Sequence, residues 1–336
     1  MILNDYKDID KILSDFSGKH IAITTHENPD GDGLCACMAL YLCLERIYGS
    51  TPVIVMDSEF PAALKFLNFK QCSIIKFSEF VEKYHTVPLL VVLDCHETPR
   101  VDTDKKIFEH AQNVLVIDHH IAKPETLRDD ANYYFDAKAS TTGVILHRFL
   151  YGHIVDKMPP LSRDFHKDYA DFIYTTILND TDNFINSNAD IETFMTTADL
   201  MKLGLKPHLV ANQFLYTKPI NYFRFIGCVL STIRVTGKIA TFYSTLQMLS
   251  DFQLTSDAYS KMLRWTKGAS DVEIQVLFQE YENDLWRISF RSDIHNVSAI
   301  AQHFGGGGHF KASGCQMTGK YDEVKAKIIA YIESQI

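Results

Sequence analysis

Four groups of acidic and histidine side chains stand out because their oxygen and imidazole donors suit a divalent metal ion. The first is the segment from His26 to Asp32 (His-Glu-Asn-Pro-Asp-Gly-Asp), which places one imidazole and the carboxylates of Asp30 and Asp32 within seven residues. The others are Asp94, Asp118-His119-His120 and Asp180-Thr181-Asp182. Donors of this kind, without thiolates, favour manganese or magnesium over a structural zinc ion.

Each group also has a purely structural explanation. Asp30 and Asp32 could cap the helix expected after them, since Asp is a preferred cap, and for that loop alone the two explanations are even. Local capping competes at Asp180 as well. Asp94 could likewise cap a helix in a βα loop, although it ends an entirely apolar strand, where a carboxylate is costly unless it is paired or binds a metal. The adjacent side chains of His119 and His120 point in different directions, so one could ligate a metal and the other reach a substrate.

Strands and helices must bring these groups together. Continuous apolar runs are typical of strands buried on both faces of a parallel sheet, and helical stretches such as 34–48 separate them. The alternation predicts an α/β fold with an N-terminal, mainly parallel sheet flanked by helices. Ligands bind at the carboxyl ends of such strands, where His26, Asp94 and Asp118 stand. Asp57 ends a run too, but capping or exposure explains it. The runs are 21–25, 52–56, 89–93 and 113–117.

The rest of the chain predicts a helix over 162–178 that delivers Asp180, then helical structure over 207–234. Ser140-Thr141-Thr142 is typical of a helix start. A smaller C-terminal α/β domain is expected to face the first across a cleft. The expected domains are 1–205 and 236–336, with a helical linker at 206–235. The elements expected in the second domain are strands at 239–246, 272–281 and 286–291, helices at 256–267, 297–304 and 322–333, and a glycine-rich loop at 305–308.

Composition narrows the function classes. The 336 residues are 46% hydrophobic and 22% charged, which excludes a disordered chain. The longest apolar run, Val87–Leu93, is too short to cross a membrane. A net charge of −9 argues against binding long duplex DNA, whereas a small anionic substrate remains compatible if metal ions supply positive charge. Seven cysteines without a repeated CxxC pair indicate a reducing, cytoplasmic location.

The ordered set of motifs resembles the DHH phosphoesterase superfamily. The resemblance rests on His26-x-x-x-Asp30-x-Asp32, Asp94, Asp118-His119-His120 and Asp180-Thr181. The second domain resembles the DHH-associated C-terminal domain through Arg291-Ser292, Gly305-Gly-Gly-Gly-His309 and Ala312-Ser-Gly314. Within the superfamily, the chain is similar to the compact two-domain branch of bifunctional oligoribonucleases and 3′-phosphoadenosine-5′-phosphate (pAp) phosphatases, including exopolyphosphatase-related proteins.

The resemblance implies two divalent ions, most often Mn²⁺ with Mg²⁺ as the alternative. It further implies that Asp118 orients a ligand histidine and that His120 contacts the scissile phosphate. Two positions depart from the family: Cys35-Ala36 replaces a Gly-Ser pair, and Asp182 replaces a glycine, so either Asp180 or Asp182 could be the fourth-motif ligand. The implied ligand sets are His26, Asp30 and Asp94 for one ion and Asp32, Asp94, His119 and Asp180 for the other, with Asp94 as the bridge.

The substrate would then be held from the second domain. Arg291 can grip a phosphate in a bidentate manner, and the glycines before His309 would let backbone N–H groups approach a phosphate or ribose. The predicted substrate-binding residues are His120, Arg291, Gly306, Gly307, Gly308 and His309, and the predicted catalytic residues are Asp94, His119 and His120.

The leading hypothesis is hydrolysis of short oligonucleotides and pAp by a water that two metal ions activate. Alternatives are a pyrophosphatase or exopolyphosphatase, a cyclic-dinucleotide phosphodiesterase, and an inactive nucleotide-binding regulator. The expected partners are short single-stranded RNA or DNA and phosphorylated nucleotides, without a membrane. A homodimer is compatible with the sequence.

Overall fold

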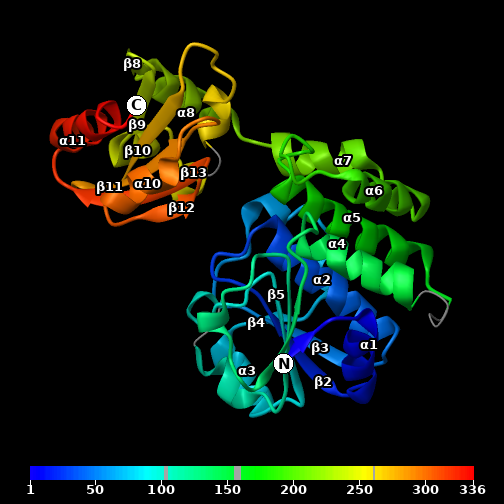
Figure 1. The fold of residues 1–336 in the computed structure, drawn as a ribbon. Coiled ribbons are helices and arrows are strands. Elements are labelled where there is room, and N and C mark those ends of the chain that lie inside the picture. Colours follow the sequence, from blue (N-terminus) through cyan, green and yellow to red (C-terminus); the bar gives the residue numbers. More distant parts are fainter. Residues whose placement is uncertain (102–104, 155–159, 260–261) are drawn as a thin grey trace. The chain divides into compact units, whose positions relative to one another are not determined.

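A computed structural model of the chain describes residues 1–101, 105–154, 160–259 and 262–336. These residues form two compact units, 1–217 and 218–336 (Figure 1). Each unit has its own sheet and its own hydrophobic core, which confirms the expected α/β class. The domain and linker boundaries expected from the sequence stay a prediction.

The N-terminal unit is built on a seven-stranded parallel sheet of order β1-β7-β6-β5-β2-β3-β4. Its strands are β1 (Ile2–Leu3), β2 (His20–Thr24), β3 (Thr51–Val55), β4 (Ile74–Ile75), β5 (Leu89–Leu93), β6 (Val114–Asp118) and β7 (Ala131–Phe135). Its α-helices are α1 (Tyr6–Asp15), α2 (Gly31–Arg46), α3 (Phe77–Tyr84), α4 (Thr142–His147), α5 (Arg163–Asp180), α6 (Ile191–Lys202) and α7 (Pro207–Ala211).

Both faces of this sheet are covered. Ile21 and Ile23 of β2 belong to a core with α1, α2, α4 and α5, whereas Ala22 between them belongs to a second core with Phe80 of α3. Every position of β5 and β6 is therefore buried, as is every position of β2 after His20. This explains why the strands are continuous apolar runs rather than alternating ones.

Helix α2 is surrounded by protein. All its residues from Gly31 to Leu44 are buried, and no charged side chain occurs between Leu34 and Leu44. A helix that is apolar all round belongs in a core, and α2 packs along α5. This packing brings the loop before α2 beside the end of α5, although the two are about 150 positions apart in sequence.

The sheet changes direction between β2 and β5. From β2 the chain continues to β3 and β4 on one side, then returns to β5 and proceeds through β6 and β7 on the other. Side chains that follow β2 and β5 therefore meet at the switch point, where open α/β sheets bind ligands.

The C-terminal unit holds a six-stranded mixed sheet of order β12-β13-β11-β10-β9-β8. Only the pairing of β9 with β10 is parallel among the described strand pairs of this sheet. Its elements are α8 (Ile220–Ser231), β8 (Arg234–Thr236), β9 (Ile239–Ser244), α9 (Leu246–Asp251), β10 (Ile274–Glu282), β11 (Leu285–Arg291), α10 (Val297–His303), β12 (Gly307–His309), β13 (Ala312–Thr318) and α11 (Tyr321–Glu333).

Three expected elements differ from the structure. The helix expected over 256–267 is instead two 3₁₀ segments, Ser256–Tyr259 and Met262–Thr266, and residues 260–261 lie outside the described ranges. A side chain of β10 binds the backbone of this segment, since Gln275 Nε2 donates to the carbonyl of Thr266. Residues 207–234 are not helical throughout, because a π-helical turn follows α7 and β8 begins at Arg234. Part of the expected glycine-rich loop is strand β12.

Within the described ranges, no helix combines the length and apolar character that crossing a membrane requires.

Candidate metal centre and active site

The strand ends predicted to carry the site lie side by side. His26 follows β2, Asp94 follows β5 and Asp118 ends β6, and these three strands are neighbours in the sheet. Asp94 has a φ of +57°, a left-handed conformation that Asp tolerates better than most side chains. Uncommon backbone conformations of this kind concentrate at functional sites.

One group of ligand atoms comes from His26, Asp30 and Asp94, all within 4.8 Å of one another. His26 Nε2 lies 3.7 Å from Asp30 Oδ1 and 3.6 Å from Asp94 Oδ2. The other ring nitrogen, Nδ1, lies 2.9 Å from the carbonyl oxygen of Glu27 and must donate to it. Nε2 therefore faces the two carboxylates.

A second group comes from Asp32, His119 and Asp180. His119 Nε2 lies 3.1 Å from Asp180 Oδ2 and 3.6 Å from Asp32 Oδ2, while its Nδ1 faces the Ala139 carbonyl at 3.3 Å. Asp94 reaches this group too, because its Oδ1 is 3.4 Å from His119 Nε2. The two oxygens of Asp94 thus face the two different groups.

The two groups have the character of cation sites. His119 Nε2 is buried, and none of its carboxylate contacts has the geometry of a hydrogen bond. Burial disfavours a charged imidazole, yet the carboxylates of Asp30 and Asp94 raise the pKa of His26 to about 10. Asp180 and Asp94 likewise raise the pKa of His119 to about 12 against burial. Hard oxygen and imidazole donors with surplus negative charge fit divalent metal ions.

Asp30 both caps helix α2 and belongs to a ligand group, the two roles that the sequence left open. As N-cap of α2, its Oδ1 accepts from the N–H groups of Asp32 and Gly33 at 2.9 and 3.2 Å. Its other oxygen accepts from Asn179 Nδ2 at 2.8 Å, and the same nitrogen lies 2.9 Å from Asp180 Oδ1. Asn179 thereby links the two acidic loops, a role that sequence reasoning missed.

Asp32 is fully buried and held by the start of α4. Its oxygens accept from the N–H groups of Thr142 and Gly143 at 2.8 and 3.2 Å. Burial, followed by the charges of Asp94 and Asp180, raises its pKa well above the usual range. Thr141 caps α4 as expected, but the contact of this helix start with Asp32 was not foreseen.

Asp118 contacts two other histidines rather than His119. It is fully buried; its Oδ2 lies 2.6 Å from His96 Nδ1, and its Oδ1 accepts from His120 Nδ1 at 2.7 Å and from the His120 N–H at 3.0 Å. The hydrogen bond to Asp118 raises the pKa of His120. The His120 side chain is 44% exposed, so its Nε2 edge is available to a substrate.

The fourth motif offers one carboxylate to the described ligand groups. Asp180 ends α5 and belongs to the second group, whereas Asp182 lies in the following turn, has a φ of +47° and belongs to none of them. A carboxylate at a helix C-terminus faces the negative end of the helix dipole, which makes a cation nearby more favourable.

Two of the residues expected to hold substrate from the C-terminal unit lie in one row of its sheet. Arg291 on β11 and His309 on β12 both lie opposite Ala312, on either side of β13. Glycine is required at 306 and 308 because a Cβ there would come within 2.1 and 2.6 Å of backbone oxygens of β13. The Gly306 N–H already donates to the Ala301 carbonyl at the end of α10.

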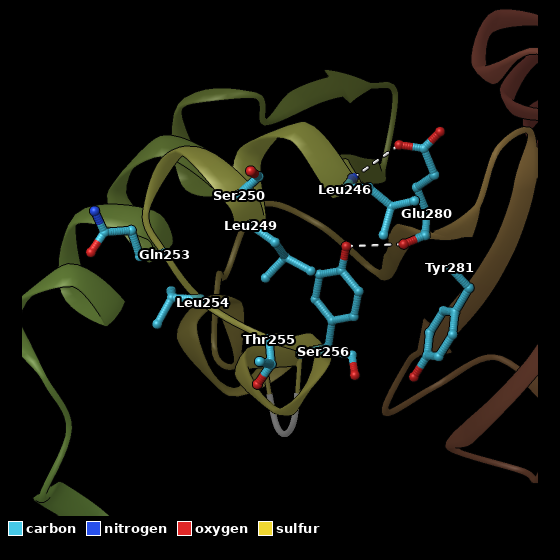
Figure 2. A pocket seen from close by; sticks show the side chains of 10 residues that line it. Leu246, Leu249, Ser250, Gln253, Leu254, Thr255, Ser256, Glu280 and Tyr281 are labelled. Atoms are coloured by element: carbon cyan, nitrogen blue, oxygen red, sulfur yellow. Dashed lines mark hydrogen bonds between the residues drawn. The ribbon is translucent and has the colours of Figure 1, made fainter.

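A cavity of about 510 Å³ in this unit lies apart from that row (Figure 2). Its wall includes Glu280 and Tyr259, whose hydroxyl donates to the Glu280 carbonyl at 3.0 Å. Glu280 pairs with Trp286, while Gln275 at the other end of β10 pairs with Arg291. Of the described residues that line it, none is an expected site residue.

The Asp57 side chain lies outside the described ligand groups. Its Oδ1 accepts from the N–H of Phe77, the first residue of α3, at 2.9 Å. Asp57 is also exposed, so it shows both features, capping and exposure, by which the sequence explained it.

Comparison with known proteins gives consistent matches along the chain. A family model described as DHH family, N-terminal domain, matches residues 20–177, and one described as DHHA1 domain matches residues 238–336. Proteins named bifunctional oligoribonuclease and PAP phosphatase NrnA are similar: one from Thermus thermophilus is 28% identical, with 94% of this chain and 90% of that protein covered. One from Mycoplasma genitalium is 26% identical, with 95% and 92% covered.

A solved structure shares the fold. It is an exopolyphosphatase-related protein from Bacteroides fragilis with a TM-score of 0.83 and 20% identity, covering 97% of this chain and 94% of that one. The two family models together span most of the chain, and the motif residues meet at one edge of its sheet. The chain therefore carries a DHH domain over residues 20–177 and a DHHA1 domain over residues 238–336, and it is a hydrolase that acts on phosphate esters.

Proposed function

We propose that this chain hydrolyses short single-stranded oligonucleotides and removes phosphate from pAp, using two divalent ions, Mn²⁺ in first place and Mg²⁺ as the alternative. The observation that carries the proposal is the pair of ligand groups faced by the two oxygens of Asp94, with the half-exposed His120 beside them. The names of the similar Thermus and Mycoplasma proteins support the choice of substrates.

His26, Asp30 and Asp94 would hold one ion, and Asp32, Asp94, His119 and Asp180 the other. When bound, such ions neutralise phosphate charge and lower the pKa of a nearby water. The protein keeps the ligands in place: backbone carbonyls accept from Nδ1–H of His26 and His119, so that each Nε2 points inward. Asp32 is fixed by two N–H groups of α4.

His120 is proposed to bind the scissile phosphate. Asp118 accepts from His120 Nδ1, which leaves Nε2 as the atom that donates to a phosphate oxygen. Because Asp118 also accepts from the His120 N–H, ring and backbone are held by one carboxylate.

Arg291 and His309 are proposed to hold a second anionic group of the substrate, with Gly307 and Gly308 lining the approach. Guanidinium and imidazole groups on the two strands that flank β13 suit a phosphate, and both oligonucleotides and pAp carry one besides the phosphate that reacts. We also propose a cytoplasmic location, which the seven cysteines support, since all lie in the described ranges and none forms a disulfide.

A comparative assay tests the function. Wild-type protein and His120→Ala are each incubated with Mn²⁺ and pentanucleotide RNA, pAp, a cyclic dinucleotide or tripolyphosphate. Turnover of RNA and pAp, lost on chelation and in the variant, is expected. Preference for tripolyphosphate or for the cyclic dinucleotide would replace the proposal with one of those activities. Nucleotide binding without turnover would indicate a regulator.

A further inference from the structure

One face of the C-terminal sheet is left open over three of its strands. Along β11 the side chains alternate: Trp286, Ile288 and Phe290 are buried in a core with α10 and α11, whereas the residues between them point to the other face. On that other face, the core built with α8 and α9 includes Leu277 of β10 but, among the described residues, none of β11, β12 or β13. We call this uncovered side of β11, β13 and β12 the open face.

Three rows of residues cross the open face from β11 to β13, and two of them continue to β12. The middle row holds only small residues, and each outer row begins with an arginine of β11. The rows are Arg287–Gln316, Ser289–Gly314–Gly307 and Arg291–Ala312–His309. Small residues let a ligand approach the backbone closely. The middle row therefore leaves room for a sugar–phosphate chain to pass from one arginine to the other.

The open face is positively charged, although the chain carries a net charge of −9. None of the residues in the three rows is acidic, and in the described part of the chain neither Arg287 nor Arg291 forms an ion pair with a carboxylate. Burial, and next the charge of Arg287, lowers the pKa of Arg291, so the two guanidinium groups repel each other. A bound anion would relieve this repulsion.

The distance between the two arginines suits a substrate longer than one nucleotide. Arg287 and Arg291 are four positions apart on β11, which is about 13 Å along the strand. Besides the phosphate that reacts, pAp has one phosphate, and Arg291 and His309 are proposed to hold it. A single-stranded oligonucleotide has further phosphates along its chain, and one of these can reach Arg287 across the middle row.

Tyr281 adds an aromatic ring beside Arg287. The Arg287 guanidinium donates from Nη1 to the Tyr281 hydroxyl at 3.3 Å, and its carbon lies 5.9 Å from the centre of that ring. Tyr281 is 39% exposed and stands in the wall of the cavity shown in Figure 2. Proteins that bind single-stranded nucleic acid combine such groups, because a basic side chain holds the backbone while a base stacks on the aromatic ring.

We propose that Arg287 and Tyr281 form a distal subsite for single-stranded oligonucleotides, in which Arg287 binds a phosphate beyond the one held at Arg291 and Tyr281 stacks on a base. The inference rests on the proposed function, because it extends the same substrate along the open face. It also separates the two proposed substrates: an oligonucleotide fills the distal subsite, whereas pAp leaves it empty.

Catalytic efficiency on the two substrates gives the first test. With saturating Mn²⁺, Arg287→Ala should lower kcat/KM about ten- to hundredfold on pentanucleotide RNA and less than about twofold on pAp. Tyr281→Ala should lower it about five- to hundredfold on the RNA, whereas Tyr281→Phe keeps the ring and should stay within about threefold of the wild type. Arg234→Ala, which removes an exposed arginine of the edge strand β8, is the matched control and should act as the wild type on both substrates.

Binding without turnover separates the subsite from the proposed activity. Fluorescence anisotropy with a fluorescein-labelled pentanucleotide RNA in EDTA should give a dissociation constant about ten- to hundredfold higher for Arg287→Ala than for the wild type. With one phosphate contact fewer, the slope of the logarithm of affinity against the logarithm of salt concentration should become shallower by about 0.7. A purely structural role of Arg287 would not change this slope.

Circular dichroism establishes that each variant is folded, and Tyr281→Phe keeps the ring if Tyr281→Ala fails to fold. Equal losses of Arg287→Ala on RNA and pAp, no loss on either, or an unchanged salt slope would overturn the distal subsite. A wild-type chain that hydrolyses pAp but does not bind the pentanucleotide would overturn it as well. A wild-type chain that binds the RNA through Arg287 and does not hydrolyse it would instead overturn the proposed function and leave the subsite standing.

Discussion

Replacing Asp118 by asparagine keeps the shape of a fully buried side chain and removes its charge. In the wild-type protein, the Asp118 carboxylate accepts from His96 Nδ1 at 2.6 Å and from His120 Nδ1 at 2.7 Å. An amide has one accepting oxygen, and its NH₂ group cannot accept from an imidazole N–H. The charged hydrogen bond that orients His120 is therefore lost or weakened.

The magnitude follows from that one bond. A hydrogen bond to a charged group contributes about 1.5–3 kcal/mol, and each 1.36 kcal/mol corresponds to a factor of ten. Asp118→Asn should lower kcat/KM about ten- to hundredfold on pAp. The metal content should stay as in the wild type, because Asp118 belongs to none of the described ligand groups.

The assay measures kcat/KM with saturating Mn²⁺ alongside metal analysis of the dialysed protein. His96→Gln is the matched control: it removes the other partner of Asp118 and leaves the His120 contact, so its loss should stay below about fivefold. Loss of metal in Asp118→Asn would mean that Asp118 is itself a ligand. Unchanged kcat/KM would mean that the orientation of His120 does not limit the reaction.

Three further predictions concern the fourth motif, the second unit and the core. Asp180→Asn should lower metal affinity and activity far more than Asp182→Asn; the reverse order in parallel assays would move the ligand by two residues. Arg291→Ala and His309→Ala should each lower kcat/KM ten- to hundredfold on pAp, with little change on an aryl phosphate that lacks a second phosphate; equal losses would contradict a clamp. Burial lowers the pKa of His147 from 6.5 to about 4, so the unfolded chain binds more protons between these pH values. The free energy of unfolding should therefore fall by up to about 3 kcal/mol as pH drops from 6.5 to 4, and urea titrations of His147→Gln should lack this dependence.

The sequence was sufficient to predict the site residues that stand at the ends of strands. His26 and Asp94 directly follow apolar runs, and the parallel sheet implied by those runs is what brings them to one edge. The fold class followed from the same runs, because strands buried on both faces leave a pattern that needs no knowledge of long-range contacts.

Residues that act through packing could not be found in this way. Asn179 meets Asp30 across 149 positions and Thr142 meets Asp32 across 110, because α2 packs against α4 and α5. The only local signals were the position of Asn179 beside Asp180 and a helix start at Thr142. His96 carried no local signal, since its partner Asp118 lies on the neighbouring strand.

The prediction of a helix over 256–267 was wrong for a related reason. Two apolar residues of this segment, Tyr259 and Met262, are buried. A continuous helix does not form, because the side chains of Gln279 and Gln275 on β10 donate from Nε2 to the backbone carbonyls of Tyr259 and Thr266 and so compete with the hydrogen bonds of a helix. Periodicity alone does not reveal such partners.

Counting the bound Mn²⁺ ions tests the central claim, a two-ion centre bridged by Asp94, most directly. Equilibrium dialysis followed by metal analysis should find two ions per wild-type chain and two per chain of Asp57→Asn, which alters a strand-end aspartate outside the ligand groups. Asp94→Asn should keep the circular dichroism of the wild type, lose both ions and hydrolyse no pAp. A folded Asp94→Asn protein that retains two ions and hydrolyses pAp would contradict the account.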